Sequence, residues 1–182
     1  MAAITAGEVL YKYSIKAGSA GNSTASAAST ALGKYISTTV WAGGTLNDLY
    51  DDVSGAENAA STVDYRCIFV HNSNTANSYQ NVVVYLSAEV AGGTAIAIAT
   101  DNIAASAIGA AAAQAAEVAT ETTAPTGTSA FSSPTTIGTG LSLGTIAVGS
   151  TRAFWIRRTA SNTAALSADG VTVAVTGDTG SL

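Results

Sequence analysis

The feature that most constrains this chain is a series of short segments in which apolar and polar residues alternate. In a β-strand, alternation with a period of two places the apolar side chains on one face. Glycine or asparagine lies shortly after most of the segments, as is typical of turns between strands. The expected strands are residues 8–16, 34–41, 65–70, 81–86, 94–99, 141–147, 152–159 and 171–176. Short strands with such turns predict an all-β fold, an antiparallel β-sandwich of jelly-roll-like type, with an immunoglobulin-like sandwich as the second choice.

The chain divides by composition into a short N-terminal part and a longer remainder. Residues 1–33 hold one strand followed by small residues, and we expect an N-terminal strand with a small-residue arm or loop there. Residues 34–182 then form the sandwich domain. The polar stretch 71–78 is typical of a hairpin connection. The alanine-rich stretch 103–120 is compatible with a short helix or with a loop and a strand.

Charge and cysteine content exclude several classes of protein. Only 10% of the residues are charged, the net charge is −5, and there is no run of lysine or arginine, so we expect no direct binding to nucleic acid. A single cysteine, Cys67, rules out an internal disulfide and fits a chain made in a reducing cytoplasm. No stretch is apolar enough to suggest a signal peptide or a membrane span.

Residues suited to catalysis are scarce. The one histidine, His71, is expected to face solvent in a turn, and Cys67 is expected to be a buried, inert thiol. There is no Gly-x-Ser-x-Gly motif, so we expect no catalytic residues, no cofactor and no enzymatic activity. The acidic residues match no calcium loop, and we expect a solvated loop there rather than a metal site. They are Asp48, Asp51, Asp52, Glu57 and Asp64.

Three stretches carry a resemblance to a known family. They are residues 47–57 leading into 65–72, residues 80–86, and residues 141–144 through 154–159. They resemble virion structural proteins of tailed bacteriophages, although residues 103–120 depart from that pattern. The resemblance implies a capsid decoration or cement protein, made in the host cytoplasm, that binds the major capsid protein on the outside of the shell. We also expect a homo-oligomer.

Tyrosine is enriched where proteins bind one another, and three tyrosines are the candidate interface anchors: Tyr11, Tyr13 and Tyr35. Packing within the chain explains them equally well. An alternative function is a tail- or fibre-associated module that binds a receptor or glycan, which would need exposed aromatic residues beside polar groups.

Overall fold

A computed structural model describes residues 3–18, 24–109, 113–166 and 168–180. The strands are β1 Val9–Ile15, β2 Tyr35–Val40, β3 Val63–Asn72, β4 Ser78–Glu89, β5 Ala95–Thr100, β6 Ser106–Ala107, β7 Leu141–Ile146, β8 Ser150–Thr159 and β9 Val171–Gly180. The helical elements are η1 Ala6–Glu8, η2 Ala28–Thr30 and α1 Gly55–Ala60.

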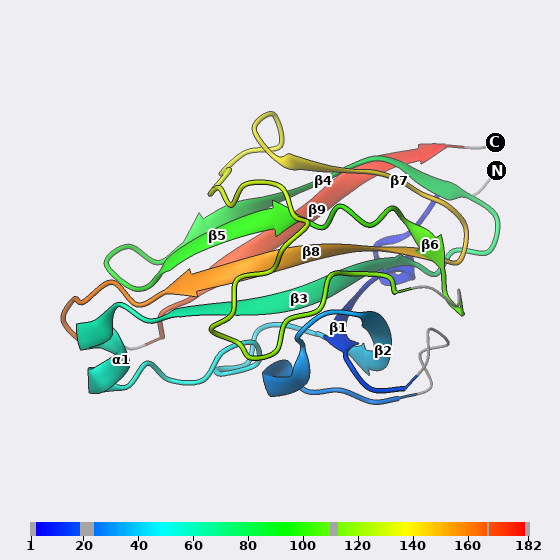
Figure 1. Ribbon diagram of the computed structural model, residues 1–182. Coiled ribbons are helices and arrows are strands. Elements are labelled where there is room, and N and C mark those ends of the chain that lie inside the picture. Colours follow the sequence, from blue (N-terminus) through cyan, green and yellow to red (C-terminus); the bar gives the residue numbers. More distant parts are fainter. Residues whose placement is uncertain (1–2, 19–23, 110–112, 167, 181–182) are drawn as a thin grey trace.

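The strands form two antiparallel sheets that pack against each other (Figure 1). The larger, six-stranded sheet has the order β2-β1-β3-β8-β5, with β6 also paired to β8. The smaller sheet has the order β7-β4-β9. Each expected strand matches one of these elements, and the predicted all-β sandwich is confirmed.

The main core lies between the two sheets. Alternate residues of β3 and β8, among them Ile68 and Phe154, point toward the smaller sheet and are fully buried. Val82 and Val84 of β4 meet them from the other side and are also fully buried. The alternating apolar residues of these strands therefore lie on their inner faces, as the sequence pattern predicted.

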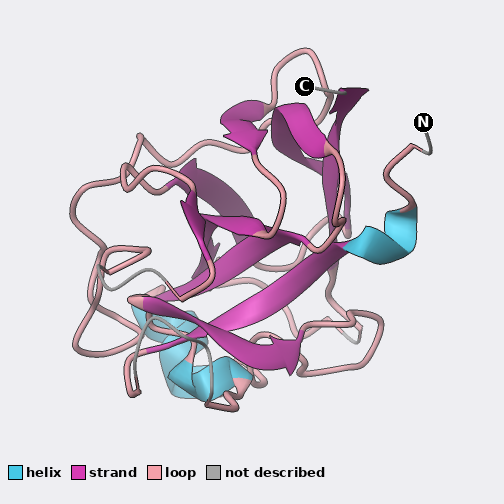
Figure 2. Cartoon of the chain, turned by 90° about the vertical axis from the view of Figure 1, so that its right-hand side faces the viewer, coloured by secondary structure: helices cyan, strands magenta, loops and turns pink. Residues whose placement is uncertain are grey.

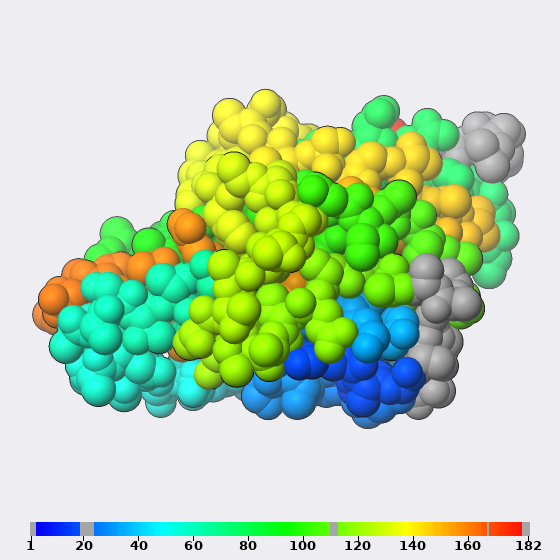
Figure 3. Space-filling model, in the orientation of Figure 1, coloured from blue at the N-terminus to red at the C-terminus, as the bar shows by residue number. Residues whose placement is uncertain are grey.

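The opposite face of the larger sheet is buried as well. There Phe69 and Trp155 pack under a long irregular segment that contributes Ala115 and Val118. Figure 3 shows the first part of this segment, in yellow-green, over the middle of this face, and the residues that follow, in yellow, at its upper edge. The carboxylate of Asp101 fixes the segment, because its Oδ2 accepts hydrogen bonds from Trp155 Nε1 at 2.9 Å and from Ala116 N at 2.8 Å.

The connection between β3 and β4 corrects one prediction. Residues 71–78 do not close a hairpin, because β3 and β4 belong to different sheets and the connection crosses between them. The side chain of Asn72 holds the crossing by donating to Asn77 O at 2.9 Å and to Ile146 O at 3.1 Å. The asparagines that suggested a tight turn instead bind the main chain of an arch.

The N-terminal part and the alanine-rich stretch also have defined places. β1 pairs with both β2 and β3, so the strand expected within residues 1–33 is an interior strand of the larger sheet. Residues 19–23 lie outside the described residues. Within the described part of 103–120 the structure has β6 and irregular chain, with no helix, and residues 110–112 lie outside the description. Figure 2 shows loops, in pink, on the periphery of the strands.

Candidate functional site

The three candidate interface tyrosines occupy different environments. Tyr13 is only 8% exposed, and its hydroxyl donates to the main-chain oxygen of Asp48. Tyr35 is half-buried, with the Lys34 ammonium 5.5 Å from its ring centre. Tyr11 packs edge-to-face against Trp41 with ring centres 6.2 Å apart. The structure therefore does not bring them together, and Tyr13 has almost no surface to offer a partner.

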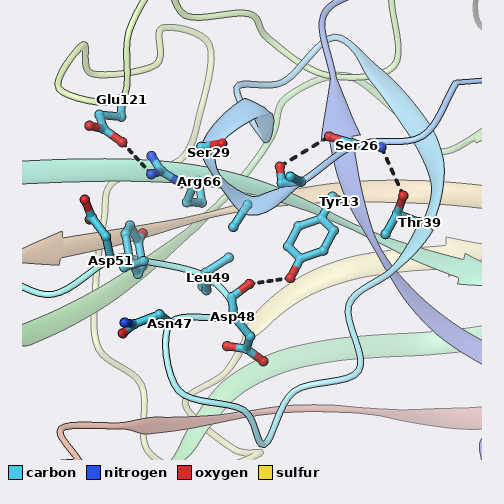
Figure 4. Close-up of a pocket in the computed structure, with 13 residues that line it drawn as sticks. Tyr13, Ser26, Ser29, Thr39, Asn47, Asp48, Leu49, Asp51, Arg66 and Glu121 are labelled. Atoms are coloured by element: carbon cyan, nitrogen blue, oxygen red, sulfur yellow. Dashed lines mark hydrogen bonds and ion pairs between the residues drawn. The ribbon is translucent and has the colours of Figure 1, made fainter.

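Tyr13 lies in the wall of a groove. This groove, groove 1, has a volume of about 610 Å³ and runs between residues 26–29 and residues 47–51 (Figure 4). Arg66 and Glu121 form one end of it, where they make an ion pair. The side chains of Ser29 and Asn47 also line the groove. Groove 1 thus presents both donors and acceptors.

A buried charged cluster lies beside groove 1. The ring of Tyr50 lies between two guanidinium groups, 5.2 Å from that of Arg66 and 4.7 Å from that of Arg158. Arg158 Nη2 lies 2.7 Å from Asp64 Oδ2, and both side chains are almost fully buried. Burial raises the pKa of the Tyr50 hydroxyl, although the two arginines partly offset the rise. Each charge is met by an opposite one, so the cluster closes this end of the core instead of offering a reactive group.

The histidine and the cysteine singled out in the sequence are also buried. His71 is 9% exposed, which corrects the expectation that it faces solvent. Burial, aided by the positive charge of Lys12, lowers the pKa of His71 to about 4. Cys67 is fully buried, and burial raises the pKa of its thiol. Neither residue has the exposure or the pKa that a base or nucleophile working near neutral pH requires.

The acidic residues are dispersed among separate structural tasks. Asp48 accepts from Trp41 Nε1 at 3.0 Å, and Asp51 lies 3.2 Å from Arg158 Nη2. Glu57 accepts from the main-chain N of Ser54 at 2.7 Å and so caps α1. Among the described residues no three histidine, cysteine, aspartate or glutamate side chains gather where they could hold a metal ion.

Two edges of the larger sheet are closed by hydrogen bonds from loops. At β5, Ile98 N donates to Ser132 O at 2.8 Å, and Ser132 N donates back to Ile98 O at 3.0 Å. At β2, Ile36 N donates to the buried side chain of Gln114 at 3.1 Å. A free strand edge can pair with another chain, so these contacts protect the larger sheet from such pairing.

The two edges of the smaller sheet differ from each other. At β7 a bulge interrupts the ladder, since Val82 pairs with Gly144 while the next residue, Val83, pairs with Ser142. Bulges of this kind blunt an edge. β9 has no such irregularity of its own, because the extra residues at its register shifts belong to β4. Among the described residues, no main-chain group outside β4 bonds to the main chain of β9.

A second groove, groove 2, lies beside the free edge of β9. It has a volume of about 290 Å³. Ile4, Val9 and Tyr11 line one side, and Val175 and the following part of β9 line the other. The Tyr11 hydroxyl is hydrogen-bonded to the main chain of Val175, and burial raises its pKa. Sequence reasoning identified Tyr11 but missed this edge, because alternation does not tell which strands lack a second neighbour.

Comparisons of the chain with protein-family models, with curated proteins and with solved structures found no match. In the described part of the chain, no helix is long and apolar enough to cross a bilayer. Over the described residues the fold defines the class, an all-β sandwich in which the outer edge of β9 pairs with no other strand.

Proposed function

We propose that this chain is a non-enzymatic structural protein of a tailed-bacteriophage virion. In this proposal it is an oligomeric decoration protein that binds the major capsid protein on the outside of the shell and stabilises the shell. The proposal rests on the sequence resemblance for the kind of particle and on the arrangement of ionisable groups for the kind of activity.

One observation carries the non-enzymatic part of the proposal. The histidine and the cysteine are buried with unfavourable pKa values, and the charged residues beside groove 1 are paired with one another. Bond-making chemistry needs a base or nucleophile that is accessible and poised near the working pH. Among the described residues these groups stabilise the fold instead, which favours a role based on shape and contact.

The stretches that carry the resemblance form the frame of the sandwich. Residues 65–72 lie in β3, residues 80–86 in β4, and residues 154–159 in β8. These strands bury the core and leave other surfaces for contact, so the resemblance supports a shared architecture. The low charge of the chain supports broad, lasting contact with neighbours, because few ions would have to lose their water.

Co-sedimentation tests the proposal. Purified chain is mixed with capsid shells that lack any decoration, and the shells are pelleted and the bound chain measured over a range of concentrations. We expect saturable binding at micromolar concentration or below, and shells that resist heating better when coated. A β-sandwich protein of similar size and net charge is the control. If the chain stays in the supernatant with that control, the proposal is wrong.

Groove 1 favours a second candidate, a tail- or fibre-associated module that binds a neutral glycan. Sugar hydroxyls both donate and accept, and groove 1 offers Asn47 and Ser29 beside the carboxylate of Glu121. Its volume of about 610 Å³ lies within the range of small-ligand sites. Binding on a glycan array that Glu121→Ala abolishes would support this candidate, and an array without signal would remove it.

A further inference from the structure

The two adjacent arginines of β8 lie on opposite faces of the larger sheet. Arg158 points into the core and lies 2.7 Å from Asp64 Oδ2, so alternation places Arg157 on the outer face. There Arg157 is the direct neighbour of Tyr65 on β3. Its guanidinium lies 5.3 Å from the ring centre of Phe131, and Tyr65 packs edge-to-face against the same ring at 5.4 Å. These three side chains form one group, the Arg157 cluster.

Arg157 differs from the other arginines in having no partner among the described residues. Arg66, Arg152 and Arg158 each donate to oxygen atoms of the chain. Arg157 forms neither an ion pair nor a hydrogen bond with any described residue, and its Nε is enclosed without an acceptor. The side chain as a whole is half-buried. Its two terminal nitrogens are therefore the donors left for an incoming group.

The carboxylate of Glu121 is engaged elsewhere, although its main chain lies beside the Arg157 cluster. Tyr65 N donates to Glu121 O at 2.8 Å, which fixes the Glu121 main chain next to β3. The side chain turns away and forms its ion pair with Arg66 at the end of groove 1. The positive charge of Arg157 is thus left without a counter-ion from the described part of the chain.

The aromatic ring prepares Arg157 to bind a planar anion. A guanidinium that stacks on a ring loses less freedom when it binds, and its fork of N–H groups matches the two oxygens of a carboxylate. Arginine is also enriched among the residues that contribute most to protein interfaces. Because Arg157 is half-buried, salt screens its charge less than that of a fully exposed side chain.

We propose that the Arg157 cluster binds an aspartate or glutamate side chain of the partner protein, with the two terminal nitrogens of Arg157 donating to its carboxylate. The net charge of −5 favours a single carboxylate over a polyanion, because a nucleic acid or an acidic membrane would be repelled by the chain as a whole. This inference rests on the proposed function for the identity of the partner, the capsid shell protein.

A peptide titration tests carboxylate binding without shells. The probe is a short peptide of alternating glutamate and glycine residues, and the control is the same peptide with glutamine in place of glutamate. The enclosed Nε–H of Arg157 exchanges slowly with water, so its NMR signal can be followed directly. We expect this signal and the amide of Tyr65 to shift with the glutamate peptide alone. Equal shifts with both peptides, or none with either at millimolar concentration, would overturn the inference.

Shell binding by three variants then tests the partner. Arg157→Gln removes the charge and the fork, whereas Arg157→Lys keeps the charge and removes the fork. Lys16→Gln is the matched control, because it removes one positive charge from a side chain that lies 3.9 Å from Glu117 Oε1, outside the cluster. Circular dichroism verifies that each variant is folded. We expect about tenfold weaker binding for Arg157→Gln, a smaller loss for Arg157→Lys and wild-type binding for the control.

Each remaining result has a separate meaning. Wild-type binding by folded Arg157→Gln, or an equal loss in Lys16→Gln, overturns the inference and leaves the decoration proposal standing. Absence of binding by the wild-type chain removes the decoration proposal, and the peptide titration then decides the inference alone. If vesicles of phosphatidylglycerol bind the wild-type chain but not Arg157→Gln, the occupant is a phosphate and the inference is wrong.

Discussion

Adding one methyl group at Gly33 tests how the outer face of the larger sheet is closed. Gly33 has a φ of +92°, and its neighbour Lys34 donates from its main-chain N to Ala116 O at 3.1 Å. A Cβ at Gly33 would lie 1.8 Å from Ala116 O and 3.0 Å from a ring carbon of Trp155. The oxygen belongs to the main chain, so the substitution Gly33→Ala forces residues 113–118 away from the sheet.

The cost has two parts that a control can separate. An alanine in the left-handed region costs about 1–2 kcal/mol by itself. Displacing the covering segment breaks the bond to Ala116 O and partly exposes Val118 and Trp155, which adds about 3 kcal/mol. At Gly44, where φ is +80°, an added Cβ would meet no other atom within 4 Å. Gly44→Ala should therefore lose only the first part of this free energy, the cost of the left-handed backbone.

Urea unfolding of the two variants measures the difference. We expect Gly33→Ala to lower the free energy of unfolding by about 3 kcal/mol more than Gly44→Ala does. Tryptophan emission of the folded Gly33→Ala protein should shift to longer wavelength, because Trp155 loses its cover. If both variants lose the same free energy within about 0.5 kcal/mol, the segment does not seat against Gly33 and the reasoning is refuted.

Four further measurements address the buried groups and β1. The pKa of His71 is lowered from 6.5 to about 4 in the folded chain. As the pH falls, His71 is therefore protonated in the unfolded chain before it is protonated in the folded chain. The contribution of His71 to the free energy of unfolding is therefore complete above about pH 6.5 and falls by up to about 3 kcal/mol as the pH drops to about 4. In urea titrations, His71→Leu should make the free energy of unfolding depend less on pH over this range. Asp101→Asn should lower the free energy of unfolding by about 2–4 kcal/mol in the same assay. The new amide NH₂ group cannot accept the hydrogen bonds that the carboxylate accepts. Deleting residues 1–33 should abolish the cooperative thermal transition seen by circular dichroism, and a retained transition would contradict the interior place of β1. Cys67 should react with a thiol-specific dye only after denaturant is added, and rapid labelling of the folded chain would contradict its burial.

The strands could be predicted because their alternation reflects burial. In β1 the residues facing the core recur at every second position, and the pattern needs no knowledge of the partner strand. β3 and β8 each contain a continuous apolar run, residues 67–70 and residues 153–156, because both faces of these strands are covered there. The sequence could therefore locate the strands although it could not indicate that residues 113–131 cover one side.

The connections were harder to predict, because the same residues serve several backbone shapes. Asn72 and its neighbours are suited to a tight turn, yet here their amides bind the main chain of an arch between sheets. A signal for α1 was present in Ser54 and Glu57, which form a capping box, but the preceding aspartates suggested a simple turn. Residue preferences act locally, whereas the packing of the whole core determines which sheet the next strand joins.

The candidate site shows the same limit. Tyr11 and Tyr13 both belong to β1 and look alike in the sequence, but Tyr13 binds Asp48 in the interior while Tyr11 lines groove 2. The difference arises because β9 ends the smaller sheet above Tyr11. The open edge of β9 could not be predicted, since being an edge is a property of sheet order and not of the strand's own residues.

The four sheet edges are best understood together with the low charge of the chain. With 7 lysines and arginines among 182 residues, this chain has few charged side chains with which to protect strand edges. It uses main-chain contacts at β5, a buried glutamine at β2 and a bulge at β7 instead. An edge without such protection is open to pairing with another chain. At β9 the Tyr11 hydroxyl bonds to the main chain of Val175, and among the described residues no main-chain group outside β4 bonds to this strand.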